Sequence, residues 1–177
     1  DVGSRDEMHG RSRGLSHLLE HLLFRGTEHY PTPTGLAGAL EARGGVFNAF
    51  TTRECTAYHV QIGRGDAEFA VAVLADMMLR PKLREHDFEK EKGAVVEELQ
   101  RQRDDPSSEV SSLLFETMFD APYGPRVGGS VESVKSLSAE SMREHFRNYY
   151  GRFFVAVAGH LRPADVERWV EHYFDAL

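Results

Sequence analysis

The chain has 177 residues, of which 41% are hydrophobic and 28% are charged, with a formal net charge of −7. This length and composition predict one globular domain over residues 1–177 with a sizeable core. The negative charge argues against nucleic acid or an anionic membrane surface as the main partner, and no run approaches the roughly 20 apolar residues of a membrane helix.

The first predicted helix covers about residues 14 to 25, where leucines recur at helical spacing. Gly26 and the prolines that follow end it. A short helix is predicted over residues 34 to 43. Two strands should follow, over residues 46 to 51 and 55 to 62, because both runs carry β-branched and aromatic side chains, which in the second run alternate with polar ones.

Residues 67 to 79 are apolar on most sides, which predicts a buried helix. A long charged helix over residues 84 to 104 should stop at Asp105 and Pro106. The remaining predicted elements are helices over residues 108 to 119 and 138 to 149, a strand over residues 153 to 158, and an amphipathic helix over residues 163 to 177. Together they predict an α+β fold.

The most informative pattern is His17-Leu18-Leu19-Glu20-His21 inside the first helix. Each residue of a helix advances by about 100°, so His17, Glu20 and His21 share one face. Two imidazoles one turn apart can hold a zinc ion, and a carboxylate beside them can take a proton from an attacking water. This arrangement is typical of a metal-dependent hydrolase.

A catalytic zinc ion needs a third protein ligand, and two histidines with one carboxylate form a common set. The best candidates lie on the 84 to 104 helix, where Glu91 and Glu98 are seven residues apart and so point in nearly the same direction. Helix geometry alone leaves open which of them binds the metal and which supports a ligand.

The chain resembles the pitrilysin, insulinase and mitochondrial processing peptidase family of inverted zincins over nearly its whole length. The matching pieces are Gly3-Ser4-Arg5, the segment Gly14 to Phe24, Gly26-Thr27, Gly44-Gly45, Asn48-Ala49-Phe50-Thr51, Thr56-Ala57-Tyr58 and Tyr149-Tyr150.

The resemblance implies one Zn²⁺ ion bound by His17, His21 and Glu98, because the family's third ligand lies 77 positions after the second histidine. Glu20 would assist the attack of a zinc-bound water, and Glu91 would orient a histidine ligand through its second ring nitrogen. The implied activity is that of a zinc metalloendopeptidase that hydrolyses peptides or unfolded segments.

The resemblance also implies a substrate-binding segment, Asn48-Ala49-Phe50, on a strand whose edge pairs with the peptide backbone. Family members have two related halves that close like a clamshell, fused or as separate subunits, and the mostly antiparallel sheet of this chain would form one of them. The distal half supplies an arginine and a tyrosine, so the isolated chain is expected to be inactive.

A non-catalytic structural subunit of the same fold is the main alternative, since some family members keep the fold with eroded motifs. The intact set of His17, Glu20, His21, Glu91 and Glu98 argues against it. S-ribosylhomocysteine lyase would need a cysteine ligand. A non-haem iron enzyme would have no need of a general base at Glu20.

The remaining reactive side chains have ordinary interpretations. Cys55 is the single cysteine, which predicts a buried or half-buried thiol and a reducing, cytoplasmic compartment. His145 lies among polar neighbours and is predicted to have a surface or cap role. The chain opens at Asp1 without an initiator methionine, so we expect an upstream segment, and its resemblance to one half of a two-half family implies sequence beyond the other end as well.

Overall fold

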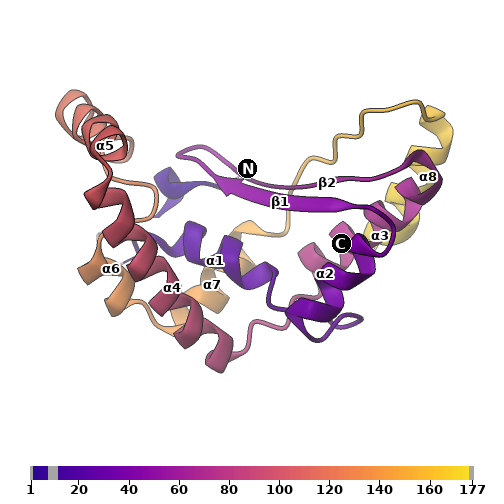
Figure 1. Ribbon diagram of the computed structural model, residues 1–177, viewed down its shortest axis with the longest axis horizontal. Helices are drawn as coiled ribbons and strands as arrows, with labels where there is room; N and C mark the ends of the chain where they lie inside the picture. The colour runs from indigo at the N-terminus through magenta and orange to yellow at the C-terminus, as the bar shows by residue number, and fades with distance from the viewer. Residues whose placement is uncertain (1, 8–11, 176–177) are drawn as a thin grey trace. The chain divides into compact units, whose positions relative to one another are not determined.

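The computed structural model describes residues 2–7 and 12–175 (Figure 1). Its regular elements are η1 (Ser4–Asp6), α1 (Leu15–Leu23), α2 (Pro33–Glu41), β1 (Val46–Thr51), β2 (Thr56–Gln61), η2 (Arg64–Asp66), α3 (Ala67–Leu79), α4 (Glu85–Asp104), α5 (Pro106–Met118), α6 (Val131–Ser136), α7 (Ala139–Tyr149) and α8 (Pro163–Phe174). In the part of the chain that the structure describes, each helix is too short or too polar to cross a membrane.

The chain divides into two compact units. The first contains residues 1–22, 50–57 and 83–150, and the second contains residues 23–49, 58–82 and 151–177. The hairpin of β1 and β2 contributes residues to both units, and it forms a two-stranded sheet. The single domain over residues 1–177 stays a prediction, while the predicted α+β class is confirmed.

The core of the first unit is built around α1. Leu15, Leu18, Leu19 and Leu22 are at most 2% exposed, so the helix buries one complete apolar face. Helix α4 packs against α5 and α6. Burying four leucine side chains contributes on the order of 2 kcal/mol each, which holds α1 rigidly and leaves its polar face to carry the histidines.

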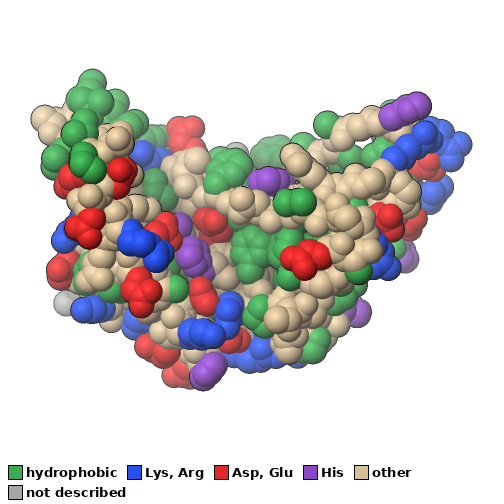
Figure 2. All heavy atoms as spheres, in the orientation of Figure 1, with side chains coloured by type: hydrophobic (Ala, Val, Ile, Leu, Met, Phe, Trp, Pro, Cys, Tyr) green, Lys and Arg blue, Asp and Glu red, His purple; other side chains and the backbone are tan. Residues whose placement is uncertain are grey.

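Helix α5 contributes no buried residue to this unit. Val110, Leu113, Leu114 and Met118 recur at helical spacing and are 48–66% exposed, and Figure 2 shows hydrophobic side chains gathered over this helix. Both glutamates of α5 form ion pairs with Arg126, at 2.8 Å each. The exposed face of α5 is therefore apolar and carries little uncompensated charge.

In the second unit, α3 and α8 pack against each other (Figure 1). Val71 and Ala75 of α3 and Phe174 of α8 form a buried cluster, against which Trp169 and Phe153 pack. The predicted helix over residues 163 to 177 ends at Phe174, and residues 176 and 177 lie outside the described part.

The predicted strand over residues 153 to 158 is wrong, because this segment has no regular structure. A strand needs a hydrogen-bonded neighbour, and in the described residues the only sheet pairs β1 with β2. The Phe153 ring instead lies 5.0 Å from the Phe174 ring, while Phe154 is 86% exposed. Helix α6 was not predicted from the sequence.

Candidate metal centre

Helix α1 presents His17, Glu20 and His21 on the face opposite its buried leucines. The helix follows Gly14, whose φ of 91° favours glycine at the turn into the helix. The side chains of His17 and His21 are 16% and 26% exposed, and their ring centroids are 4.8 Å apart. Both imidazoles are therefore close together and reachable from solvent.

Helix α4 brings Glu91 and Glu98 to the same place. Phe88, Val95 and Leu99 are at most 5% exposed and fix the orientation of the helix, so the two glutamates face α1. The side chains of Glu91 and Glu98 are 10% and 29% exposed. The seven-residue spacing thus places both carboxylates beside the histidines, as the sequence predicts.

The four side chains meet through specific atoms. Glu98 Oε2 lies 3.2 Å from His17 Nε2 and 3.5 Å from His21 Nε2. Glu91 Oε2 lies 3.3 Å from Nδ1 of His21. Each of His17, His21 and Glu98 offers one ligand atom, and these atoms lie within 4.8 Å of one another.

The electrostatics of this cluster favour a bound cation. Burial alone would lower the pKa of both histidines, but hydrogen bonds to carboxylates outweigh it. The hydrogen bonds to Glu20 and Glu98 raise the pKa of His17 to about 9. The hydrogen bonds to Glu91 and Glu98 likewise raise the pKa of His21 to about 9. Hydrogen bonds from His17 and His21 lower the pKa of Glu98. The carboxylates thus favour positive charge at the two rings, and a metal ion bound to the ring nitrogens would displace their protons.

The donor set fits zinc. Two imidazole nitrogens and one carboxylate oxygen are a common catalytic zinc set, which leaves one coordination position open. The donor separations of 3.2 and 3.5 Å are close to the edge of a tetrahedron with bonds of about 2.1 Å, which is roughly 3.4 Å. The donor types and the two separations that involve Glu98 therefore suit a tetrahedral zinc site.

Glu20 lies beside this cluster and is hydrogen-bonded to Thr51, a residue for which the sequence predicts no role. Thr51, the last residue of β1, donates its hydroxyl proton to Glu20 Oε2 at 2.5 Å. The same oxygen lies 3.5 Å from His17 Nδ1. Burial would raise the pKa of Glu20, but the hydrogen bonds from His17 and Thr51 lower it, so the carboxylate is ionised.

The predicted substrate segment lies on β1. Asn48 and Phe50 are exposed and Ala49 is half-buried, in the alternation expected of a strand. Asn48 and Ala49 belong to the second compact unit, whereas Phe50 belongs to the first together with His17, Glu20, His21, Glu91 and Glu98. The structure brings those last five residues together, and the role of residues 48–50 stays a prediction.

Comparison with known proteins agrees with this geometry. A sequence model described as insulinase, peptidase family M16, matches residues 1–129. The chain belongs to the insulinase family. A protein named as an uncharacterized zinc protease of Streptomyces coelicolor is 37% identical to it over 177 residues, which cover 98% of this chain and 38% of that protein.

Two further matches to this insulinase-family chain are also longer than the chain itself. A probable mitochondrial-processing peptidase subunit beta of Arabidopsis thaliana is 31% identical, over 100% of this chain and 34% of its own length. The crystal structure of a protease from Helicobacter pylori shares the fold, with a TM-score of 0.89, 24% identity and coverage of 99% of this chain and 43% of that one. The chain thus spans about two fifths of the length of the proteins that it matches.

Proposed function

We propose that this chain is the zinc-binding half of a metalloendopeptidase that hydrolyses peptide bonds in peptides or unfolded protein segments. The observation that carries the proposal is the convergence of His17, His21 and Glu98 donor atoms beside the ionised Glu20 carboxylate. The name of the Streptomyces relative, a zinc protease, supports it.

Each residue of the cluster has a distinct proposed role. His17, His21 and Glu98 would hold one zinc ion, which when bound supplies Lewis acidity toward a water molecule and the scissile carbonyl. Glu91 would fix the ring of His21 through Nδ1, leaving Nε2 for the metal.

Glu20 would move the protons of the reaction. Its carboxylate takes a proton from the attacking water and passes it to the amine that leaves when the C–N bond breaks. Amide hydrolysis needs both transfers, because an amide nitrogen is a poor leaving group until it is protonated. Its lowered pKa keeps Glu20 in the basic form that the first transfer requires.

The peptide would bind along β1. β1 has a single strand neighbour, β2, among the described residues. A peptide that adds to a strand edge is held by main-chain hydrogen bonds, so affinity depends little on its sequence. Asn48, Ala49 and Phe50 would form this binding segment, which suits an enzyme that accepts varied peptides.

We further propose that a second, homologous half completes the enzyme, fused or as a separate subunit. The chain spans 34–38% of two relatives that match it over nearly all of its own length, and one of those relatives is named as a subunit. The second half would enclose the peptide and contribute groups that position it.

Metal removal tests the proposed function directly. We expect the full-length protein, with both halves present, to cleave an unstructured peptide, to lose this activity on treatment with 1,10-phenanthroline, and to regain it with about one equivalent of zinc per active half. Peptide cleavage is followed by mass spectrometry and zinc by atomic absorption. Cleavage that persists in metal-free protein would exclude the proposed chemistry, and zinc binding without any cleavage would favour the structural subunit.

Replacing Glu91 with alanine should weaken the site without abolishing it. The variant loses the carboxylate 3.3 Å from His21 Nδ1, and we expect zinc affinity or activity to fall about 10- to 100-fold. Zinc affinity is measured by competition with a chromogenic chelator. Glu89→Ala, on an exposed position of the same helix, is the matched control, and equal affinities in the two variants would show that Glu91 does not support the metal site.

A further inference from the structure

The Thr51 hydroxyl binds only one of the two carboxylate oxygens of Glu20, so the two oxygens have different surroundings. Oε2 accepts the Thr51 hydroxyl proton at 2.5 Å and lies 3.5 Å from His17 Nδ1. Among the residues that the structure describes, none makes a hydrogen bond or ion pair with the other oxygen, Oε1. One oxygen is therefore anchored, and the other can accept a proton from a water molecule.

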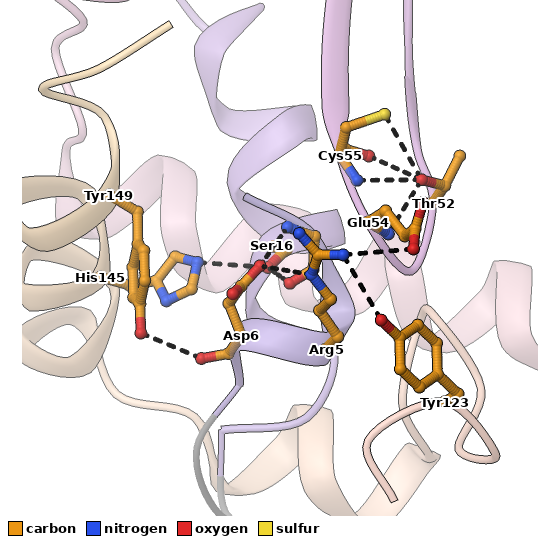
Figure 3. Close-up of polar contacts among 10 residues, drawn as sticks. Arg5, Asp6, Ser16, Thr52, Glu54, Cys55, Tyr123, His145 and Tyr149 are labelled. Atoms are coloured by element: carbon orange, nitrogen blue, oxygen red, sulfur yellow. Dashed lines mark hydrogen bonds and ion pairs between the residues drawn. The ribbon is translucent and has the colours of Figure 1, made fainter. Parts of the chain in front are cut away.

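The strand end that carries Thr51 is fixed by main-chain hydrogen bonds. The amide of Ser4 donates to the Thr52 carbonyl at 3.1 Å, and the amide of Arg5 donates to the Arg53 carbonyl at 3.0 Å. Figure 3 shows the turn at Thr52 beside this N-terminal segment, with Arg5 reaching Glu54 and Tyr123. The backbone that follows Thr51 is thus tied to residues 3–7.

The start of the helix that carries Glu20 is tied to the same segment. Ser16 is fully buried, its amide donates to Glu7 Oε1 at 2.8 Å, and its hydroxyl lies 3.3 Å from the Gly3 carbonyl oxygen. His145 Nε2 lies 3.2 Å from the same hydroxyl (Figure 3). His145 is only 6% exposed, so its predicted surface role is wrong, and burial lowers its pKa to about 4.

At Gly3 the N-terminal segment lies very close to the backbone of the turn that follows β1. A Cβ atom at Gly3 would lie 2.5 Å from the Arg53 carbonyl oxygen and 2.7 Å from the Cys55 nitrogen, so only glycine fits without a backbone shift. Residues 3–7 therefore connect the first turn of α1 to the end of β1. This connection fixes the Glu20 carboxylate relative to the Thr51 hydroxyl.

We propose that Thr51 is a positioning residue of the peptidase: its hydroxyl holds Glu20 Oε2 so that Oε1 takes the proton of the attacking water. The proposal rests on the proposed function, in which Glu20 is the base. Thr51 directly follows Phe50 of the proposed substrate segment, so the strand that would bind the peptide also orients the base. β-branched threonine suits this role, because its side chain has few rotamers on a strand.

The test compares Thr51→Val with Thr51→Ser in the zinc-loaded, full-length protein. Valine keeps the shape and removes the hydroxyl, and we expect kcat to fall about 10- to 100-fold with KM and zinc content unchanged. Serine keeps the hydroxyl and should restore kcat to within about threefold. Thr117→Val, on exposed helix α5, is the matched control and should leave kcat unchanged.

Glu20→Gln serves as the reference in the same experiment. If Glu20→Gln is inactive while Thr51→Val keeps the original kcat, the positioning role is overturned and the proposed function stands. If Glu20→Gln remains active, the proposed function itself fails, and with it the role of Thr51. Equal losses of kcat in the valine and serine variants, with lower melting temperatures, would assign Thr51 to folding instead.

Discussion

Replacing Glu20 with glutamine is expected to abolish measurable peptide cleavage while zinc stays bound. Glutamine keeps the size of the side chain and can still contact Thr51, but it cannot accept the proton of an attacking water. A positioned general base contributes about 10²- to 10⁴-fold to a rate, and a loss of that size should appear in kcat. His17, His21 and Glu98 are untouched, so about one zinc ion per active half should remain.

The measurement pairs a peptide-cleavage assay with zinc analysis on the same preparation. Glu97→Gln is the matched control, because Glu97 is exposed on α4 and the chemical change is identical. We expect this control to keep full activity. Undiminished cleavage by the Glu20→Gln variant would refute the assignment of the base, whatever its zinc content.

Replacing Glu98 with alanine is expected to remove zinc and activity together. Among the residues that the structure describes, Glu98 is the one carboxylate within 3.5 Å of Nε2 of both His17 and His21, so its loss removes a proposed ligand and leaves the two rings without a shared anionic partner. We expect zinc affinity to fall on the order of 10²-fold or more, because binding energies of 10–16 kcal/mol at four-ligand structural sites suggest about 3 kcal/mol per ligand.

Zinc competition and atomic absorption measure this loss, and circular dichroism shows whether the variant remains folded. Glu97→Ala, on the adjacent exposed position, should bind zinc as the original protein does. A Glu98→Ala variant with normal zinc affinity would mean that another residue supplies the third ligand. The two variants together test the proposed metal ligand and the proposed base separately.

The local parts of this site can be predicted from the sequence because a helix has a fixed geometry. The spacing of His17, Glu20 and His21 places them on one face, and the seven-residue spacing of Glu91 and Glu98 does the same on α4. The distinct roles proposed for the two glutamates came from the family resemblance, because helical periodicity treats both alike. Their pairing with different nitrogens of His21 appears only in the structure.

Features that depend on contacts between distant segments could not be predicted. The bond from Thr51 to Glu20 depends on how the end of β1 meets α1, which no spacing rule encodes. His145 has polar neighbours in the sequence, yet α7 buries it against Ser16. The apolar run at residues 153–158 has the composition of a strand, but composition cannot supply a neighbouring strand.

The long separation in sequence between the proposed ligands has a consequence for the order of folding and metal binding. His17 and His21 leave the ribosome well before Glu98, because that glutamate comes 77 positions after the second histidine. Until α4 docks, two imidazoles on a short, isolated helix offer only a weak and transient hold on a metal ion, and closing so long a loop is entropically unfavourable. Metal loading is therefore expected to follow the docking of α4, when all three proposed ligands lie together.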